Sequence, residues 1–586
     1  MKNQEIAKIL REIGEYLEMK DEPFKPRAYA KAAEAIDAMD EDIEKVYNSG
    51  GMRSIEEIPG VGVSIAEKIE EFLKTGKVGY HEELKKKTPV DVSSLSAVEG
   101  LGPKKIKKLF RELDIRTIDD LEKAAEAHRV RELKGFGEKT EEAILKGIRF
   151  LRESGGRFVL GFVESQIEEL RARIASVKGV KKAEIAGSAR RKKETIGDLD
   201  ILAIVDDDRE AAERAMDVFV SMPEVSHVYS RGETRSSVRL GTGMDVDLRI
   251  LDRASYGAGL LYFTGNKDHN IELRRIAIKK GFKLNEYGLF SISNGREKLI
   301  AREEEVQIYE HLGMAYIPPE MRESTGEIEA AMTGRLPDII NYGELQGDLQ
   351  IQTNWSDGED TIEELAMEAI KNGLKYILIT DHSKRLTVAN GLDEKRLIEQ
   401  GKEIDKVNAR LRDRGHDFTV LKGIECDILK DGLPDLSDDV LAQLDIVGAS
   451  VHSYFNLPAA DQAERIIRAM ENENVDILFH PTTRIINQRK PIEVDMGEII
   501  KAAKRTGTTL EIDAYPDRLD LKDEYIRECV AAGVKLSIDS DAHSKRHMRY
   551  LDLGVAQARR GWAEKKNIVN AWPVKKCLQL IKKTEK

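Results

Sequence analysis

The chain has 586 residues, of which 41% are hydrophobic and 34% are charged, and its formal net charge is −12. At roughly 100–200 residues per domain, this length predicts about three to five folded units whose cores need no disulfide staples. The sequence has no apolar run of about 18 residues and no apolar signal segment, so we expect neither a transmembrane nor a secreted protein.

The cysteine content and the charge distribution narrow the class further. Cys426, Cys529 and Cys577 are far apart and form no Cys-x-x-Cys pair, which excludes a disulfide scaffold and a cysteine zinc finger and leads us to expect a cytoplasmic protein. Residues 101–200 carry 24 Lys and Arg against 18 Asp and Glu, whereas residues 301–350 carry 3 against 11. Local patches decide phosphate binding, so the acidic sum does not exclude a nucleic-acid partner.

Residues 1–150 read as short helices punctuated by Gly and Pro. Three segments, 58–69, 98–110 and 133–145, each place an apolar-x-Gly-x-Gly turn before an amphipathic helix. Such a turn leaves backbone N–H groups at the start of the helix free for a DNA phosphate. The candidate DNA-binding residues are Gly60, Gly62, Gly100, Gly102 and Lys104. A plain connection between helices is the alternative; three copies favour DNA-backbone binding, and the target of the third stays open.

Lys68 lies on the helix that follows the first of these turns. One interpretation is a solvated surface lysine. The other is a nucleophile that forms a Schiff base with the aldehyde of an abasic sugar, which requires a lowered pKa. Spacing alone does not decide between the two.

From about residue 183 the apolar period becomes that of strands. The predicted strands are 183–189, 199–205, 236–241 and 244–251, and residues 253–315 return to mixed helix and turn. Asp198 and Asp200 stand at i and i+2, so both point to one face. Carboxylates placed in this way can bridge two Mg²⁺ ions about 3.5–4 Å apart, which activate a hydroxyl and stabilise a leaving pyrophosphate. Asp245 and Asp247 also share a face and offer a third carboxylate.

The residues before these aspartates suit phosphate binding. We expect Gly187 and Ser188 to end the preceding strand and to receive phosphate oxygens, and Arg190 and Arg191 to neutralise phosphate charge. A single Asp-x-Asp pair is usually an exposed strand edge. The combination in GSARRKKETIGDLD (187–200) is far more specific.

This segment, with VDLR (246–249) and YFTGNKDHN (262–270), resembles the family X DNA polymerases over roughly residues 1–320. The resemblance implies a repair polymerase that binds deoxynucleoside triphosphates and gapped or primed duplex DNA. It implies two Mg²⁺ or Mn²⁺ ions on Asp198, Asp200 and Asp247, with Asp247 preferred over Asp245 because the family's third aspartate precedes the Leu-Arg end of the strand. The nucleotide contacts that it implies are Gly187, Ser188, Arg191, Gly197, Tyr262, Phe263, Gly265, Asn270 and Arg274.

The N-terminal segments resemble the lyase domain and fingers of the same family. The resemblance places Lys68 on the family's Schiff-base lysine. It places Lys25, Tyr29 and Lys31 on the pocket for a DNA 5′-phosphate. Ser64 stands where a further lysine of that pocket is expected, which implies weaker phosphate binding or a contribution from other residues.

A second pattern begins near residue 346 and alternates strands with helices. The predicted strand segments are 347–353, 375–383, 421–429, 445–453, 475–482, 509–517 and 534–543. Seven such strands predict a parallel α/β barrel or an open sheet, with the functional residues where the strands end. The histidines and acids found there are Asp357, His382, Glu425, His452, His480, Asp541 and His543. Imidazole and carboxylate together suit Zn²⁺, Mn²⁺ or Fe²⁺.

This half resembles the polymerase-and-histidinol-phosphatase (PHP) domain, a distorted α/β barrel with a multinuclear metal site, here with Zn²⁺ or Mn²⁺. In fused polymerases the resemblance implies 3′–5′ exonuclease activity. One motif departs from the family: its first His-x-His is Gln350 and Gln352 here, in GDLQIQTNWSDG. A neutral amide oxygen is a poor substitute for imidazole, so we expect a weakened or empty metal position and a slow, altered or absent nuclease.

Together these features predict a multidomain α+β and α/β protein, which we expect to be a monomer. Its predicted parts are a helical helix-hairpin-helix lyase-like domain (1–90), fingers (91–155), a nucleotidyltransferase palm with a mixed sheet (156–252), a thumb (253–318), a linker (319–345) and a distorted (β/α)7 PHP barrel (346–586). The leading hypothesis is a gap-filling DNA polymerase. The alternatives are a PHP-type nuclease whose front half is a DNA-binding adaptor, and a non-enzymatic scaffold for DNA ends.

Overall fold

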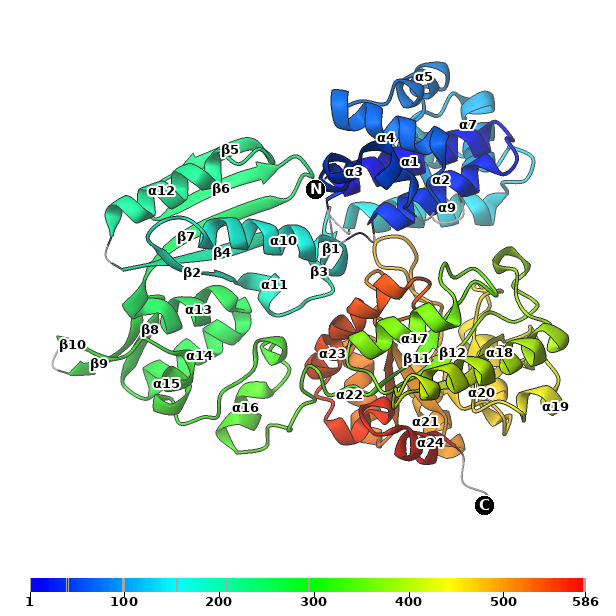
Figure 1. Ribbon diagram of the computed structural model, residues 1–586. Helices are drawn as coiled ribbons and strands as arrows, with labels where there is room; N and C mark the ends of the chain where they lie inside the picture. Colours follow the sequence, from blue (N-terminus) through cyan, green and yellow to red (C-terminus); the bar gives the residue numbers. More distant parts are fainter. Residues whose placement is uncertain are drawn as a thin grey trace. The chain divides into compact units, whose positions relative to one another are not determined.

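The computed structural model describes residues 2–582 apart from 38, 40, 41, 59, 97, 99, 100, 154, 155, 207, 294 and 295. The chain forms two compact units (Figure 1). Unit 1 comprises residues 1–156 with 485–490, and unit 2 comprises 157–484 with 491–586. No helix in the described part of the chain is long and apolar enough to cross a membrane.

Unit 1 is built from short helices around one apolar core. They are α1 (Lys2–Met19), α2 (Lys25–Asp37), α3 (Ile43–Glu56), α4 (Val63–Thr75), α5 (Gly79–Lys87), α6 (Val92–Ser96), α7 (Pro103–Leu113), α8 (Ile118–Glu126) and α9 (Glu138–Glu153). Isoleucines and leucines of α1, α4, α7 and α8 meet in that core. The helical prediction for this region is therefore confirmed.

The three glycine turns begin helices, as predicted. Gly62 and Gly102 are the N-cap residues of α4 and α7, and Pro103 occupies the first turn of α7. Gly60 and Gly135 have φ of +76° and +90°, a backbone conformation that favours glycine. Gly100 lies outside the described residues.

The region predicted as the palm, residues 156–252, holds a five-stranded mixed sheet in the order β2-β4-β7-β6-β5, and we keep the name palm for it. Its strands are β2 (Val180–Ile185), β4 (Asp198–Val205), β5 (Val225–Arg231), β6 (Arg235–Leu240) and β7 (Asp245–Asp252), and a separate pair joins β1 (Phe158–Val159) to β3 (Thr195–Ile196). Helices α10 (Leu160–Ala175) and α12 (Arg209–Val220) pack on this sheet through a shared apolar cluster. The prediction that Gly187 and Ser188 end a strand is wrong: they begin a one-turn helix, α11 (Gly187–Arg190), after β2 has ended.

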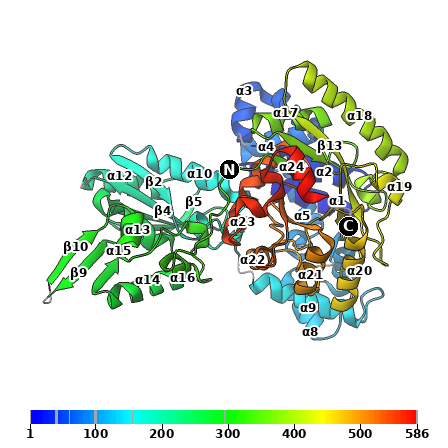
Figure 2. The same ribbon diagram turned by 90° about the horizontal axis from the view of Figure 1, so that it is seen from below.

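The thumb contains three helices and a small sheet that the sequence did not reveal. They are α13 (Tyr256–Thr264), α14 (Lys267–Lys279) and α15 (Glu305–His311), with β8 (Phe282–Asn285), β9 (Gly288–Ser293) and β10 (Arg296–Ala301). The β9–β10 hairpin projects from the thumb helices (Figures 1 and 2). Residues 319–345, predicted as a linker, are packed: α16 (Glu327–Met332) lies there, and Met321, Ile328 and Ile339 belong to the thumb's apolar cluster.

The C-terminal half is a barrel of seven parallel strands in sequence order, which confirms the α/β prediction. The strands are β11 (Gly347–Ile351), β12 (Tyr376–Ile379), β13 (Thr419–Asp427), β14 (Ile446–Ser450), β15 (Ile477–Leu478), β16 (Thr509–Asp513) and β17 (Leu536–Asp539). The helices are α17 (Ile362–Lys371), α18 (Glu394–Asp413), α19 (Asp438–Leu441), α20 (Ala459–Glu471), α21 (Met496–Thr506), α22 (Asp523–Ala532), α23 (Leu551–Arg560) and α24 (Val574–Ile581). The backbone N–H of Gln352, just after β11, donates to the backbone carbonyl oxygen of Ala542, just after β17, at 2.8 Å. This hydrogen bond brings the ends of the first and last strands together.

Candidate active sites

The carboxylates of the palm lie on two adjacent parallel strands. In the register of β4 and β7, Asp200 stands opposite Asp247, and Asp198 stands opposite Asp245. Burial, with the charges of Asp198 and Asp247, raises the pKa of Asp200 to about 6. Asp245 instead forms an ion pair with Arg239, with N···O distances of 2.8 and 3.1 Å. Asp247 also pairs with an arginine, Arg235, at 2.7 Å, but it is Asp198 and Asp247 whose charges act on Asp200.

The α11 turn brings the predicted phosphate contacts to these carboxylates. Gly187 has φ of +60°, and a Cβ added there would lie 2.5 Å from the Oδ2 atom of Asp200. Only a glycine allows this close approach. Ser188 follows on the same turn, and Gly197 directly precedes Asp198.

Arg191 is held from the thumb side. Its Nε donates to the Oε1 atom of Glu323 at 2.8 Å, and its Nη1 donates to the carbonyl oxygen of Thr264. A Cβ added at Gly265, which has φ of +71°, would lie 3.2 Å from that Nη1. The structure thus brings Arg191 next to the glycine of the YFTGN segment.

Three of the remaining predicted nucleotide contacts line one small cleft. Tyr262, Asn270 and Arg274 lie in its wall. Asn270 donates to the carbonyl oxygen of Tyr262 at 2.7 Å, and the Nε of Arg274 donates to that of Asn270 at 3.3 Å. The ring of Phe263 lies edge-on to Tyr262, with centroids 5.1 Å apart. The structure thus brings Tyr262, Asn270 and Arg274 to one cleft and packs Phe263 against Tyr262.

The surroundings of Lys68 act on its charge in both directions. Its Nζ donates to the carbonyl oxygen and hydroxyl of Ser64 at 2.9 and 3.1 Å, and it lies 5.2 Å from the ring centre of Tyr80. Burial lowers its pKa, against the opposing charges of Glu67 and Glu71. Tyr29 is buried, whereas Lys31 is exposed.

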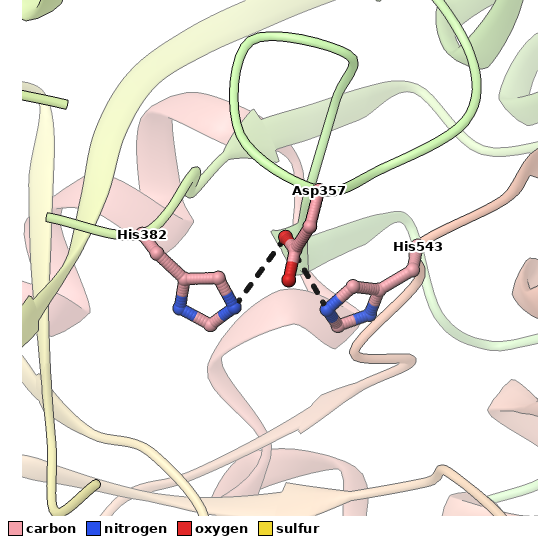
Figure 3. A group of neighbouring side chains, drawn as sticks. All are labelled: Asp357, His382 and His543. Atoms are coloured by element: carbon pink, nitrogen blue, oxygen red, sulfur yellow. Dashed lines mark ion pairs between the residues drawn. The ribbon is translucent and has the colours of Figure 1, made fainter. Parts of the chain in front are cut away.

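The barrel gathers its histidines and acids where its strands end, around Glu425. His382, His452 and His480 approach this carboxylate at 3.0, 3.1 and 2.8 Å. Burial favours the neutral acid, but the imidazoles of His382 and His452 hold the pKa of Glu425 well below its ordinary value. Asp357, His382 and His543 form a second group, in which the carboxylate lies between the two rings (Figure 3).

The donor set of this site fits metal ions in part. Two groups could each hold an ion: Asp357 with His382 and His543, and His382 with Glu425 and His452. Among the described residues, Nδ1 of His480 and Oδ1 of Asp541 are buried without a hydrogen-bond partner, as expected of ligand atoms. Imidazole nitrogens and carboxylate oxygens suit Zn²⁺ or Mn²⁺.

The two glutamines fit less well. With its amide turned to donate, Gln350 gives hydrogen bonds of 2.5 and 3.1 Å to Glu511. Gln352 donates to the Oε2 atom of Glu425 at 3.1 Å. Both amides thus direct N–H groups at carboxylates, and only the Oε1 atom of Gln352, which is buried without a hydrogen-bond partner, keeps a lone pair for a cation.

Comparisons with known proteins agree with this geometry. Family models match the DNA polymerase beta thumb over residues 259–323 and the PHP domain over 348–571. The DNA polymerase/3′-5′ exonuclease PolX of Bacillus subtilis (strain 168) is 38% identical over 588 residues, with both chains covered in full. This chain belongs to the PHP-containing family X DNA polymerases.

Other matches of this family X chain are partial. Two further models match a helix-hairpin-helix domain (1–78) and a SAM-like helix-hairpin-helix tandem (92–149). A probable phosphatase of Thermoanaerobacter sp. (strain X514) is 32% identical over 197 residues, 31% of this chain and 72% of its own. DNA polymerase lambda of Arabidopsis thaliana is 25% identical over 325 residues, 50% of this chain and 57% of its own.

Sequence reasoning missed one cation at the PHP site of this family X chain. The Nε of Arg518 lies 3.6 Å from carboxylate oxygens of both Asp513 and Asp541. Its position could have indicated it, since Arg518 directly follows the predicted strand 509–517. Metal-ligand patterns, however, contain acids and histidines and no arginine. Arg518 supplies positive charge to carboxylates that would otherwise repel one another.

Proposed function

We propose that this family X chain fills short gaps in DNA during repair by adding a deoxynucleotide to a 3′-hydroxyl opposite a template. The observation that carries the proposal is the meeting of Asp198, Asp200 and Asp247 with the glycine-led α11 turn. The three carboxylates offer hard oxygen ligands for two Mg²⁺ or Mn²⁺ ions, and the turn offers backbone N–H groups to a triphosphate.

The residues of the palm and thumb would have different roles in nucleotidyl transfer. When bound, the metal ions activate the 3′-hydroxyl and neutralise the leaving pyrophosphate. Ser188 and Arg191 bind the phosphates, and Gly197 lets the backbone approach them. Tyr262, Phe263 and Gly265 line the sugar pocket and disfavour a 2′-hydroxyl, while Asn270 contacts the base and Arg274 the template side. Catalysis of this kind is mostly positioning and charge stabilisation.

Unit 1 would bind the DNA and remove a blocked 5′ end. Gly60, Gly62, Gly102 and Lys104, with Gly100 outside the described residues, place helix N-termini against backbone phosphates, a contact that carries no base specificity. Lys25, Tyr29 and Lys31 would hold a 5′-phosphate. The Nζ of Lys68 would attack the C1′ aldehyde of an abasic deoxyribose phosphate, lose water to form an iminium and allow β-elimination of the 3′ phosphate.

The barrel supports a second activity, the hydrolysis of phosphodiesters at DNA 3′ ends. Asp357, His382, Glu425, His452, His480, Asp541 and His543 would hold Zn²⁺ or Mn²⁺ there. Because Gln350 and Gln352 direct amide N–H groups at carboxylates, we expect fewer ions than a complete site would hold and slow hydrolysis. We further propose a cytoplasmic monomer.

Primer extension tests the polymerase. A duplex with a one-nucleotide gap is incubated with Mg²⁺ and the complementary dNTP, and wild type is compared with Asp198→Asn. We expect addition of one nucleotide by the wild type and its loss in the variant. Equal synthesis by both proteins, or none by the wild type, would refute the proposal.

Primer shortening tests the barrel. A recessed 3′ end is incubated with Mn²⁺ and no nucleotide, and wild type is compared with His480→Ala. Shortening by the wild type alone would mean that the barrel trims 3′ ends. No shortening by either protein would reject nuclease activity of this domain on such ends.

A further inference from the structure

The turn that joins α11 to β3 in the palm is held by side chains of the barrel. This turn, residues 191–194, lies between Ser188 and Asp198, and thus between the proposed phosphate contacts and the first proposed metal ligand. Lys192 has φ of +51°, in the left-handed region that side-chain-bearing residues rarely adopt. Such a conformation persists where the surroundings hold it in place.

Arg560, the last residue of α23, binds the backbone of this turn. Its Nη1 donates to the carbonyl oxygens of Lys192 at 2.6 Å and of Arg191 at 3.3 Å. Its Nε pairs with Asp523 at 2.9 Å, and its side chain is only 2% exposed. A planar guanidinium fixed on one side by a carboxylate presents its other N–H groups in a set direction. The backbone of Arg191 is thereby tied to the barrel.

Glu194 is a second tie, two residues further on. Arg484 gives it two hydrogen bonds, 2.6 Å from Nη2 and 3.2 Å from Nη1, and Gln557 donates to it at 2.7 Å. Burial opposes its ionisation, but Arg484 and Arg560 lower the pKa of Glu194 to about 2, so the carboxylate is charged. The Nε of Arg484 also donates to the carbonyl oxygen of Arg518 at 2.8 Å, which fixes the guanidinium to the barrel.

The surfaces around these ties are closely packed. A Cβ added at Gly161, near the start of α10, would lie 2.5 Å from Cδ1 of Leu553 and 2.8 Å from Cβ of Pro516. The palm backbone therefore contacts barrel side chains directly at this position.

We propose that Arg484, Gln557 and Arg560 are positioning residues of the polymerase site. The barrel holds the 191–194 turn so that Ser188 and Arg191 are already placed for an incoming triphosphate. This inference rests on the polymerase function proposed above. It gives the barrel a role in DNA synthesis that does not depend on its own metal site.

The test is nucleotide affinity in gap filling, with Arg560→Gln and Arg559→Gln as a matched pair. Arg559 precedes Arg560 on α23 and binds Glu320 at 3.0 Å and the carbonyl oxygen of Ile340 at 2.7 Å. In the assay, dTTP is titrated opposite a template adenine. We expect Arg560→Gln to raise the KM for dTTP about ten-fold, because the buried carbonyl oxygens of Arg191 and Lys192 lose their hydrogen bonds. We expect kcat to fall by a smaller factor. We expect Arg559→Gln to leave the KM for dTTP near that of the wild type.

The outcomes separate this inference from the function on which it rests. Wild-type protein that adds no nucleotide refutes the polymerase function. If the wild type adds nucleotide but Arg560→Gln has an unchanged KM for dTTP, the positioning inference is refuted and the polymerase function stands. The same holds if the KM for dTTP rises equally in Arg560→Gln and Arg559→Gln. If Arg560→Gln has a lowered melting temperature, Glu194→Gln is tested in its place, because glutamine keeps the shape of the glutamate side chain and removes its charge. An unchanged KM for dTTP in folded Glu194→Gln also overturns the inference. Affinity for gapped DNA, measured without dTTP, should be the same in all variants.

Discussion

Among single residues, the carboxylates of the palm differ in how they act on Asp200. Asp245 and Asp247 share one face of β7, yet Asp245 is matched by Arg239 on the neighbouring strand. Asp247 also contacts a cation, Arg235, at 2.7 Å, but its charge adds to that of Asp198 in raising the pKa of Asp200. Divalent cations would relieve that repulsion, because opposite charge favours the ionised acid.

Replacement of Asp247 and of Asp245 by asparagine should therefore differ in effect. Asp247→Asn is expected to lower the rate of nucleotide addition by at least about 100-fold, because about 3 kcal/mol of metal-derived stabilisation is lost. Asp245→Asn removes a partly exposed ion pair and should change the rate less than about three-fold. Single-turnover gap filling measures both; the reverse order would assign the third ligand to Asp245.

Lys68 provides a second test at a single residue. Borohydride should trap the wild-type protein on DNA that carries a 5′-deoxyribose phosphate, and Lys68→Ala should abolish the trapped product. Lys74→Ala is the control, since Lys74 lies on the same helix, where its ion pair with Glu70 raises its pKa. Trapping that survives in Lys68→Ala would assign the Schiff base to another amine.

At the level of elements, buried ion pairs join the palm to the thumb. Glu305, at the start of α15, accepts from Arg190 of α11 and from Arg322, each at 2.6 Å. Burial opposes the charge on Glu305, but the two guanidinium groups lower its pKa to about 2. Helix α11 is thus fixed to the thumb, and the 191–194 turn that follows it is fixed to the barrel.

The ion pairs of Glu305 with Arg190 and Arg322 predict that the stability of the protein depends on pH. Because the folded pKa of Glu305 lies below the usual 4.5, its contribution of about 3 kcal/mol is full above pH 4.5 and is lost as the pH falls toward 2. Glu305→Gln should lower the free energy of unfolding by about this amount at pH 7, and the deficit should shrink below pH 4.5. Urea unfolding of Glu305→Gln at several pH values measures this deficit in the free energy of unfolding, and Glu304→Gln, at an exposed neighbouring position, is the control. A deficit that stays constant down to pH 3 would contradict this assignment.

The elements that sequence patterns missed share a physical reason. In β5, six of seven residues are exposed, and most of β10 is exposed too, so neither strand shows the alternation that marks a half-buried strand. Helix α11 is a single turn, too short for helical periodicity to register. The seven barrel strands were found because they are buried on both faces and read as apolar runs.

For the whole molecule, two glutamines determine how many ions we expect the barrel to hold. Gln350 and Gln352 form hydrogen bonds with Glu511 and Glu425, and these two neutral amides stand where the family pattern has imidazole ligands. The barrel fold itself does not depend on those ligands, since a continuous apolar cluster supports it.

Restoring the histidines should restore metal affinity. The double variant Gln350→His, Gln352→His is expected to bind more Mn²⁺ per chain after equilibrium dialysis and to shorten a recessed 3′ end at least about ten-fold faster, because imidazole replaces an amide on the metal. Gln443→His adds a histidine at an exposed position and is the control. Chelation should return the double variant to the wild-type rate; no gain in bound Mn²⁺ would mean that other residues limit the site.

The sequence by itself determined the chemistry of this protein, because Asp-x-Asp on a strand, glycine turns before helices, and histidines at strand ends are local patterns with a fixed geometry. It also located Gln350 and Gln352 as the departure from the PHP pattern. Only the tertiary structure decided the partners of those groups: that Asp200 faces Asp247, that the glutamine amides face carboxylates, and that Arg484 and Arg560 reach the palm turn. These contacts join residues tens to hundreds of positions apart, and their distances depend on how the strands and domains pack, which no local pattern encodes.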